Sequence, residues 1–451
     1  MNHQESSLPD AQAPPPVSFT AALGFWLKLG FISFGGPAGQ IALMHQELVE
    51  RRRWISEKRF LHALNYCMVL PGPEAQQLAT YIGWLMHRTW GGVVAGGLFV
   101  LPSLFILIAL SWIYIAFGNT TLVAGLFYGI KPAVTAIVLQ AAHRIGTRAL
   151  KGAVPWAIAA LAFVAIFVFN VPFPAIIIAA GLIGALHGRI APDKYKGGGH
   201  GAGGKTYGAA VIDDSTPTPA HALFTWSRLT LVCVAGALLW AVPLLTLTAL
   251  WGWQHALTQM GWFFTKAALL TFGGAYAVLP YVYQGAVTDF QWLTPTQMID
   301  GLALGETTPG PLIMVVAFVG FVGGYVKALF GPEQLFLAGA LAACVVTWFT
   351  FLPSFLFILG GGPLVESTHG NIKFTAPLAA ITAAVVGVIV NLAMFFGYHV
   401  LWPAGFAGRI DWISALIAIA AAVALFQYKR NVMHVIGACA LVGLLVKLAL
   451  G

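Results

Sequence analysis

Two glycine- and proline-rich motifs interrupt long apolar stretches in the first half of the sequence, and both recur in the second half. Gly35-Gly36-Pro37 and Pro71-Gly72-Pro73 come first, and Gly273-Gly274 and Pro309-Gly310-Pro311 follow at the same spacing. A helix interrupted inside a membrane leaves backbone N–H groups without partners at the positive end of the helix dipole. Such ends bind anions, and glycine lets a ligand approach closely. The motifs therefore predict an anion site, although a single motif would also fit a packing kink.

Lysine side chains within the apolar stretches could supply the positive charge that such a site needs. Lys131 lies about ten residues into its stretch and is followed by Pro132. An ionisable group at that depth is costly enough to be a functional candidate. We therefore expect Lys131 to be the main countercharge, unless its side chain extends to the membrane interface. Lys28 and Lys266 occupy equivalent positions before the first break of each half, where they could serve the site or face lipid and extend to the interface.

Acidic and uncharged polar side chains flank the same motifs. Glu74 follows the first Pro-Gly-Pro and Glu306 precedes the second. Each could carry a proton, balance a lysine or hold a neutral structural hydrogen bond. Further donors beside these breaks could line an oxyanion site: Gln76, Gln77, Thr307 and Thr308. Asp300 and His62 are equivalent in position but differ in charge, so we assign no role to them.

The composition is that of a helical membrane protein. Of the 451 residues, 59% are hydrophobic and 8% are charged, and the mean hydropathy is +0.83, whereas soluble domains carry about 25% charged residues. Apolar stretches of about 20 residues match a bilayer core about 30 Å thick. We expect an all-α polytopic membrane protein. Its net charge of +8 arises in loops without a continuous basic face, which favours phospholipid contact and excludes nucleic acid as a partner.

Signatures of enzymes and of cofactor sites are absent from the sequence. It has no HExxH, GxSxG or Walker A pattern, so we expect neither enzyme activity nor ATP hydrolysis. The four cysteines lie in apolar stretches without a CxxC pair, and His187, His200 and His221 are widely spaced. We therefore expect no disulfide framework, no metal site and no cofactor.

The chain is predicted to consist of two related halves. Residues 25–73 align without a gap to residues 263–311 at a constant offset of 238, and Leu101-Pro102-Ser103 matches Leu352-Pro353-Ser354 after an insertion. The expected organisation is a disordered N-terminal tail (1–17), a first transporter repeat (18–188), a flexible Gly- and His-rich cytosolic linker (189–222), a linking transmembrane helix (223–257) and a second transporter repeat (258–451).

The membrane topology follows from the number of apolar stretches and from the positive-inside rule. Six stretches in each half and one between them give an odd link, which inserts the second half upside down as an inverted repeat. If the two broken stretches of each half are re-entrant, the loop Lys and Arg residues divide 17 inside to 3 outside. If every stretch crosses, they divide 12 to 8. We therefore predict re-entrant stretches, nine full spans, a cytosolic N-terminus and a periplasmic C-terminus. The breaks should then meet at one enclosed internal site.

These motifs together resemble the chromate ion transporter family in its long-chain, two-domain form. The likeness covers nearly the whole chain outside the tail and the linker. It rests on five runs: Phe31–Pro37, Leu70–Leu78, Lys131–Val134, Phe272–Pro280 and Glu306–Pro311. The resemblance implies a bacterial inner-membrane exporter of chromate that confers chromate resistance, with sulfate as the competing anion. One departure is Ala275 in place of Pro37, so the two anion-facing breaks need not be equivalent.

Two transporter functions stay open from the sequence. The first is chromate efflux driven by the membrane potential or a proton gradient, with chromate, sulfate and the lipid bilayer as partners and a homodimer as one assembly. The second is a proton-coupled carrier of sulfate or another organic or inorganic anion, in which Glu74 and Glu306 do the work. An intramembrane hydrolase is disfavoured because no nucleophile stands beside a base.

Overall fold

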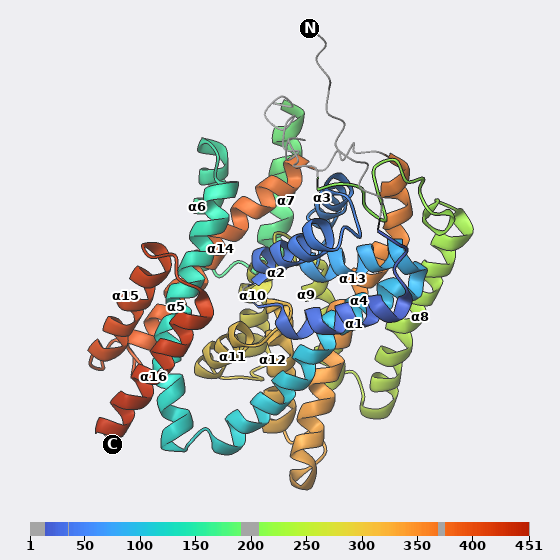
Figure 1. The fold of residues 1–451 in the computed structure, drawn as a ribbon. Coiled ribbons are helices and arrows are strands. Elements are labelled where there is room, and N and C mark those ends of the chain that lie inside the picture. The colour runs from blue at the N-terminus through green and yellow to red at the C-terminus, as the bar shows by residue number, and fades with distance from the viewer. Residues whose placement is uncertain (1–13, 35, 191–206, 369–374, 451) are drawn as a thin grey trace.

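The computed structural model describes residues 14–34, 36–190, 207–368 and 375–450, and within these ranges the chain is helical, with one isolated β-bridge (Figure 1). Among these described residues, seven helices are long and apolar enough to cross a membrane. The protein is therefore a multi-pass, all-α membrane protein, which confirms the predicted fold class.

The two halves contain corresponding series of helices. The first half consists of α1 (Phe19–Ile32), α2 (Gly36–His45), the π-helix η1 (Gln46–Arg51), α3 (Glu57–Cys67), α4 (Glu74–Phe117), α5 (Thr121–Ala149), α6 (Ala153–Phe167) and α7 (Phe173–Ile190). The short η3 (Ala220–Ala222) and the linking helix α8 (Trp226–Trp251) follow. The second half consists of α9 (Ala256–Leu269), α10 (Ala275–Tyr283), the π-helix η4 (Gln284–Asp289), α11 (Pro295–Thr307), η5 (Leu312–Met314), α12 (Val315–Val326), η6 (Pro332–Gln334), α13 (Leu335–Thr368), α14 (Thr375–Leu401), α15 (Trp412–Phe426) and α16 (Val432–Leu450).

The long helix α4 is two helices joined at a kink. Its 44 residues would extend about 66 Å at 1.5 Å per residue, which is too long for one crossing. Non-helical backbone at His87 and Arg88 divides it. The first part completes the broken stretch that α3 begins, and the second part has the length of a full span. In the second half the same two parts are α12 and α13, separated by a turn.

Seven of the nine predicted crossings correspond to the long apolar helices. The other two, α6 and α15, are apolar helices of 15 residues each. They occupy equivalent places in the two halves, so the same helix is shorter than the long spans in both halves.

The repeat extends to details of the backbone. The π-helices η1 and η4 are separated by the same offset of 238 residues. Each is followed by a residue with positive φ, Arg53 at 52° and Gln291 at 50°. The amides of Trp54 and Trp292 then donate to carbonyls six residues earlier, at 2.7 Å in both halves. Two halves with the same local geometry at the same offset confirm the predicted duplication.

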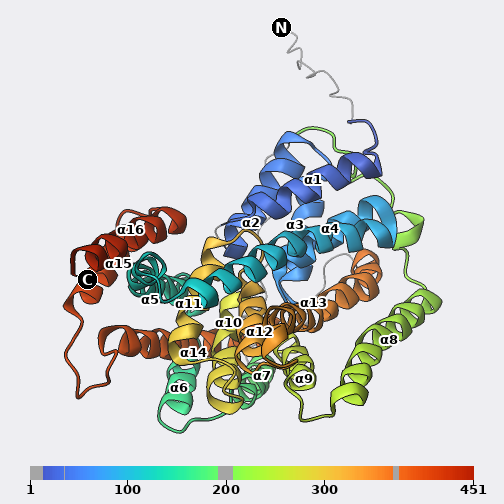
Figure 2. The same cartoon turned by 90° about the horizontal axis from the view of Figure 1, so that it is seen from below.

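The two halves are related by inversion. The equivalent helices α5 and α14 pack together, and Gly146 faces Val386 while Gly397 faces Thr135. Residue numbers therefore rise along one helix as they fall along the other, so the two helices are antiparallel. Figure 2 shows α5 beside α15 and α16, and α14 beside α6 and α7. These contacts are equivalent, and opposite directions of equivalent spans define an inverted repeat.

Small residues bring the central helices into close contact. A Cβ atom on Gly129 of α5 would lie 1.8 Å from the Cys439 carbonyl oxygen of α16, and one on Gly443 would lie 2.2 Å from the Gly129 nitrogen. Helices in a membrane associate mainly through such close packing, because apolar contact alone gains little in lipid.

The described end of the linker lies on the first half. Ile212 forms the β-bridge with Ile55, and its amide donates to the Trp54 carbonyl at 3.0 Å. The His221 ring nitrogen lies 2.9 Å from the Trp84 carbonyl oxygen, and burial lowers the pKa of His221. Residues 207–222 of the predicted flexible linker are therefore held against this half. Residues 191–206, including His200, lie outside the described residues, as do residues 1–13 of the predicted tail.

We predict that Gly129→Ala destabilises the protein, because the added methyl group must separate α5 from α16. Overpacking of this kind costs about 1–3 kcal/mol. The measurement is thermal unfolding of the purified protein in detergent. Gly437→Ala on α16 is the control, because nothing lies within 4 Å of its added Cβ. Equal stability of the two variants would contradict the α5–α16 packing.

Candidate functional site

The helices are interrupted at all four motifs. We number these interruptions in chain order as break 1 (33–34), break 2 (68–73), break 3 (270–274) and break 4 (308–311). Gly35, one of the predicted site residues, lies outside the described residues. The broken helices predicted from the sequence are thus present in both halves.

The breaks are joined in pairs, and each pair takes one break from each half. The Gly310 amide of break 4 donates to the Ser33 carbonyl of break 1 at 2.8 Å. The Gly72 amide of break 2 donates to the Thr271 carbonyl of break 3 at 2.7 Å. These two bonds are equivalent at the offset of 238. Each half therefore satisfies the interrupted backbone of the other.

A further contact links the two pairs. Tyr276, just after break 3, donates its hydroxyl hydrogen to the carboxylate of Glu306, just before break 4. Both side chains are buried, and Ser33 and Thr271 are fully buried. The four breaks form one connected cluster in the protein interior.

Two of the predicted anion-binding amides are occupied within the protein. Gly72 and Gly310 donate to the backbone of the other half, and both have φ values, +127° and +99°, that favour glycine. Added Cβ atoms would lie 2.3 Å from the Ser354 hydroxyl oxygen and 2.8 Å from the Ser103 Cβ, respectively. The flanking prolines, Pro71, Pro73, Pro309 and Pro311, belong to the same packed turns. Breaks 2 and 4 therefore hold the halves together in this conformation.

Breaks 1 and 3 are more open. An added Cβ on Gly36 or on its equivalent Gly274 would meet nothing within 4 Å. Among the described residues, no protein acceptor is recorded for the amides of Gly273 and Gly274. They precede α10, and Gly36-Pro37 opens α2. Breaks 1 and 3 thus have open space beside the helix starts that follow them.

Gln40 was not identified from the sequence, yet it bridges one pair of breaks. Its side-chain nitrogen donates to the Gly310 carbonyl at 2.5 Å and to the Ser33 carbonyl at 3.2 Å. Its side chain is 1% exposed, and its amide oxygen has no hydrogen-bond partner among the described residues. The equivalent residue is Val278. The signal available in the sequence was a glutamine in an apolar stretch, one turn after Gly-Gly-Pro.

The predicted uncharged donors lie beside the breaks, but their hydrogens are used locally. Gln76 donates to Thr80 at 3.0 Å and Gln77 to the Pro71 carbonyl at 2.8 Å. Thr307 and Thr308 donate to carbonyls of α11 at 2.9 and 3.2 Å. The amide oxygens of Gln76 and Gln77 are buried and have no hydrogen-bond partner in the part of the chain that the structure describes.

Lys131 is paired with an acid that the sequence did not assign. Its Nζ lies 3.4 Å from Oδ2 of Asp300 on α11, and the Tyr114 hydroxyl donates to the same oxygen at 2.8 Å. The Asp300 side chain is 3% exposed, whereas that of Lys131 is 27% exposed. Within the described ranges, Oδ1 of Asp300 is buried without a hydrogen-bond partner. The sequence did not reveal this role of Asp300, because the equivalent residue in the first half is His62 and not a second carboxylate.

The other charged candidates are distributed differently. Lys28 is exposed on α1, and Lys266 lies 5.9 Å from the ring centre of Trp262, so neither is brought to the breaks by a recorded contact. Glu74 opens α4, where the positive helix end favours a carboxylate. Arg148 is within electrostatic range of Glu74, and Arg144 is within range of Glu306. Both arginines lie at the end of α5 and were counted from the sequence only as loop cations.

Comparison with known proteins gives similarity over both halves. A family model described as chromate transporter matches residues 20–185 and 258–444. The "Chromate transport protein" of Pseudomonas aeruginosa is 35% identical over 448 residues, covering 96% of this chain and 94% of that protein. The protein of the same name from Cupriavidus metallidurans is 29% identical over 433 residues, covering 95% and 94%.

A shorter protein is similar to part of the chain. The "Uncharacterized transporter YwrA" of Bacillus subtilis is 30% identical over 174 residues, which are 38% of this chain and 97% of that protein. No solved structure matches the chain significantly.

We predict that Lys131→Met lowers stability, because it leaves Asp300 buried without its countercharge. Replacing both residues, as Lys131→Met with Asp300→Asn, should recover most of the loss. We expect a coupling energy of about 1–3 kcal/mol, below that of a fully buried pair because Lys131 is partly exposed.

Thermal unfolding of the two single variants and the double variant measures this coupling. Lys327→Met, at an exposed lysine on the turn after α12, is the control. Additive effects of the two substitutions would show that the ion pair is not formed.

Proposed function

The chain belongs to the chromate transporter family, and we propose that it exports chromate across a bacterial inner membrane and thereby confers chromate resistance. The observation that carries this proposal is the similarity over both halves to relatives named for chromate transport. Those names favour a transporter over an enzyme. The enclosed cluster of broken helices supports the same conclusion, since such helices form the binding sites of inverted-repeat transporters.

The substrate in this proposal is held by the open helix ends of breaks 1 and 3. Chromate is a tetrahedral dianion, and the backbone amides that start α2 and α10 carry a partial positive charge that attracts it. Gln40 lies on α2 after break 1, and its side-chain amide holds the Ser33 and Gly310 carbonyls in place. The packed breaks 2 and 4 serve as the rigid part of the site rather than as its donors.

Lys131 supplies the full positive charge. In the present conformation it is paired with Asp300, which lies on the helix leading into break 4. An incoming dianion competes with this carboxylate for the lysine. The contact of 3.4 Å and the partial exposure of Lys131 make the lysine accessible to such competition. Asp300 is thus the resident counterion in the absence of substrate.

The membrane potential is sufficient to drive export. Moving one charge through 100 mV is worth about 2.3 kcal/mol. A dianion leaving an inside-negative cell therefore gains about 4.6 kcal/mol per 100 mV. At about 1.4 kcal/mol per tenfold, this sustains a gradient on the order of a thousandfold.

A second function, a proton-coupled carrier of sulfate or another anion, is favoured by one observation. Glu306 is buried at break 4 and bonded to Tyr276 at break 3, so a change in its protonation would act directly on the cluster. Flux of radiolabelled chromate and sulfate into inverted vesicles separates the two functions. The chromate exporter predicts chromate flux, and a carrier for another anion predicts none.

We predict that Lys131→Met abolishes chromate uptake by inverted vesicles, whereas Lys131→Arg retains part of it. The double variant with Asp300→Asn is the decisive comparison. It should be folded and nearly as stable as the parent, yet still inactive, because the countercharge for the anion is gone. Parent-level flux in the double variant would reduce Lys131 to a structural partner of Asp300.

We also propose that the loop at Arg53 faces the cytosol, with the N-terminus inside and the C-terminus outside. Reporter fusions after Arg53 and after Lys447 test this topology. We expect cytosolic fluorescence from the first and periplasmic phosphatase activity from the second. A periplasmic signal after Arg53 would contradict the re-entrant stretches and require every apolar stretch to cross.

A further inference from the structure

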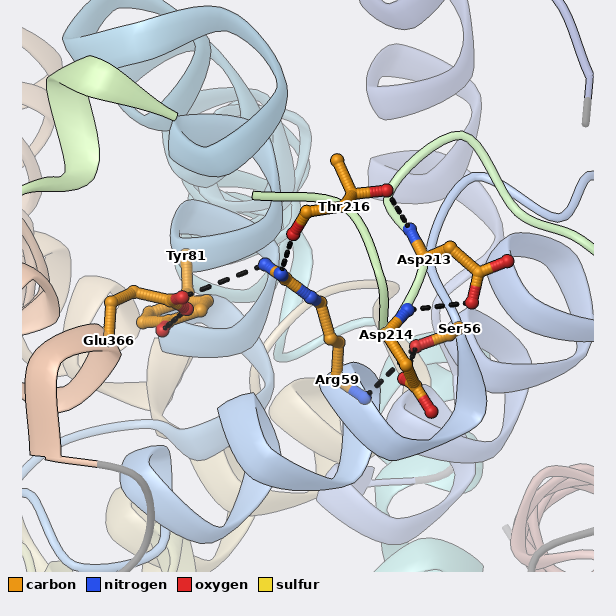
Figure 3. Close-up of polar contacts among 7 residues, drawn as sticks. All are labelled: Ser56, Arg59, Tyr81, Asp213, Asp214, Thr216 and Glu366. Carbon is orange, nitrogen blue, oxygen red and sulfur yellow. Dashed lines mark hydrogen bonds and ion pairs between the residues drawn. The ribbon is translucent and has the colours of Figure 1, made fainter. Parts of the chain in front are cut away.

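An ion-pair network joins the two halves at the beginning of α3 (Figure 3). Nη1 of Arg59 lies 3.7 Å from a carboxylate oxygen of Glu366, and the Tyr81 hydroxyl donates to the other oxygen. Nη2 of Arg59 donates to the Thr216 carbonyl of the linker. The side chains of Arg59 and Glu366 are 16% and 10% exposed. We call these three side chains, Arg59, Tyr81 and Glu366, the Arg59 network.

The Asp300 network is the set of Asp300, Tyr114 and Lys131. It also joins the halves, because Asp300 lies on α11 of the second half and its partners lie on α4 and α5 of the first. Both networks therefore connect a short helix that precedes a Pro-Gly-Pro break to the far end of a long helix in the other half.

The two networks occupy corresponding places in the repeat. Arg59 and Asp300 lie within one turn of each other when α3 is aligned to α11. Tyr114 lies three residues before the end of α4, and Glu366 lies two residues before the end of α13. Since the halves are inverted, these places face opposite sides of the membrane. In Figure 1, α3 lies toward the top of the molecule and α11 toward the bottom.

The acidic or basic residue that each short helix contributes to its network has no counterpart of the same charge in the other half. The residues equivalent to Arg59 and Asp300 are Gln297 and His62. Neither ion pair can therefore re-form at the equivalent place when the halves exchange conformations. Each pair stabilises closure of its own side.

We propose that the Arg59 network and the Asp300 network are the two gates of this transporter, which open alternately to expose the central breaks. The proposal rests on the transport function proposed above. Opening the Arg59 gate separates α3 from Glu366, and opening the Asp300 gate separates α11 from Tyr114 and Lys131. Because the anion competes with Asp300 for Lys131, substrate loosens the Asp300 gate, whereas the Arg59 gate has no lysine at the site.

The linker fixes which part moves at the Arg59 gate. The Ser56 amide donates to the Ile212 carbonyl at 3.0 Å, and its hydroxyl donates to Asp214 at 2.6 Å (Figure 3). Ser56 is also the N-cap of α3. Residues 212–216 therefore travel with α3 and Arg59, and the gate opens at the contact with Glu366.

Native Cys67 provides a reporter for this gate. It ends α3, follows Tyr66, which contacts both Tyr81 and the Phe357 carbonyl, and is fully buried. With Cys233, Cys344 and Cys439 replaced by serine, we would measure the rate at which Cys67 of the purified full-length protein reacts with a polar maleimide. Glu366→Gln should increase this rate several-fold, and Tyr81→Phe should increase it less.

Asp300→Asn should lower the same rate below that of the serine-substituted parent, because opening one gate favours closure of the other. Glu333→Gln, at an exposed acid of the second half, is the control and should change nothing. Rates that change in the same direction in the Glu366 and Asp300 variants, or do not change, would overturn the gates. Reciprocal rates without chromate flux by the parent would retain the gates and refute only chromate as the substrate.

Discussion

The constraint on which this structure depends is that backbone polar groups inside a membrane need partners. Four interrupted helices leave such groups in the interior, and the two halves supply partners for each other. The Gly310 amide bonds to Ser33, and the equivalent Gly72 amide bonds to Thr271. Neither half could enclose its own breaks in this way. The inverted arrangement thus satisfies the backbone hydrogen bonds of the breaks, in addition to any role in transport.

The same constraint explains what the sequence could predict. Glycine and proline in mid-stretch mark breaks because they disrupt helices locally, and a constant offset reveals duplication without any knowledge of packing. The occupation of the Gly72 and Gly310 amides could not be predicted, since it depends on how the halves fit together. The partner of Lys131 was hidden for the same reason. Asp300 lies 169 residues away in the chain, in the other half.

Charge is distributed asymmetrically over a nearly symmetric backbone. The caps, π-helices and paired amides repeat, but the chemically active side chains do not: Gln40 corresponds to Val278, Asp300 to His62 and Glu306 to Met68. A symmetric framework gives two conformations of similar energy, related by exchange of the halves. Charged residues that have no charged equivalent in the other half then make these conformations differ in energy, as a directional response to a charged substrate requires.

The asymmetry between the halves also explains why the chain contains the linking helix α8. A chain with only one half could form reciprocal breaks only with a second, antiparallel copy, and both copies would then carry the same side chains. Fusion allows the halves to diverge, but an even number of crossings in each half would return the second half in the same orientation. One additional crossing inverts it. Only 11% of an apolar 18-residue window of α8 is buried within the protein, so its main contribution is to reverse the chain rather than to pack against the site.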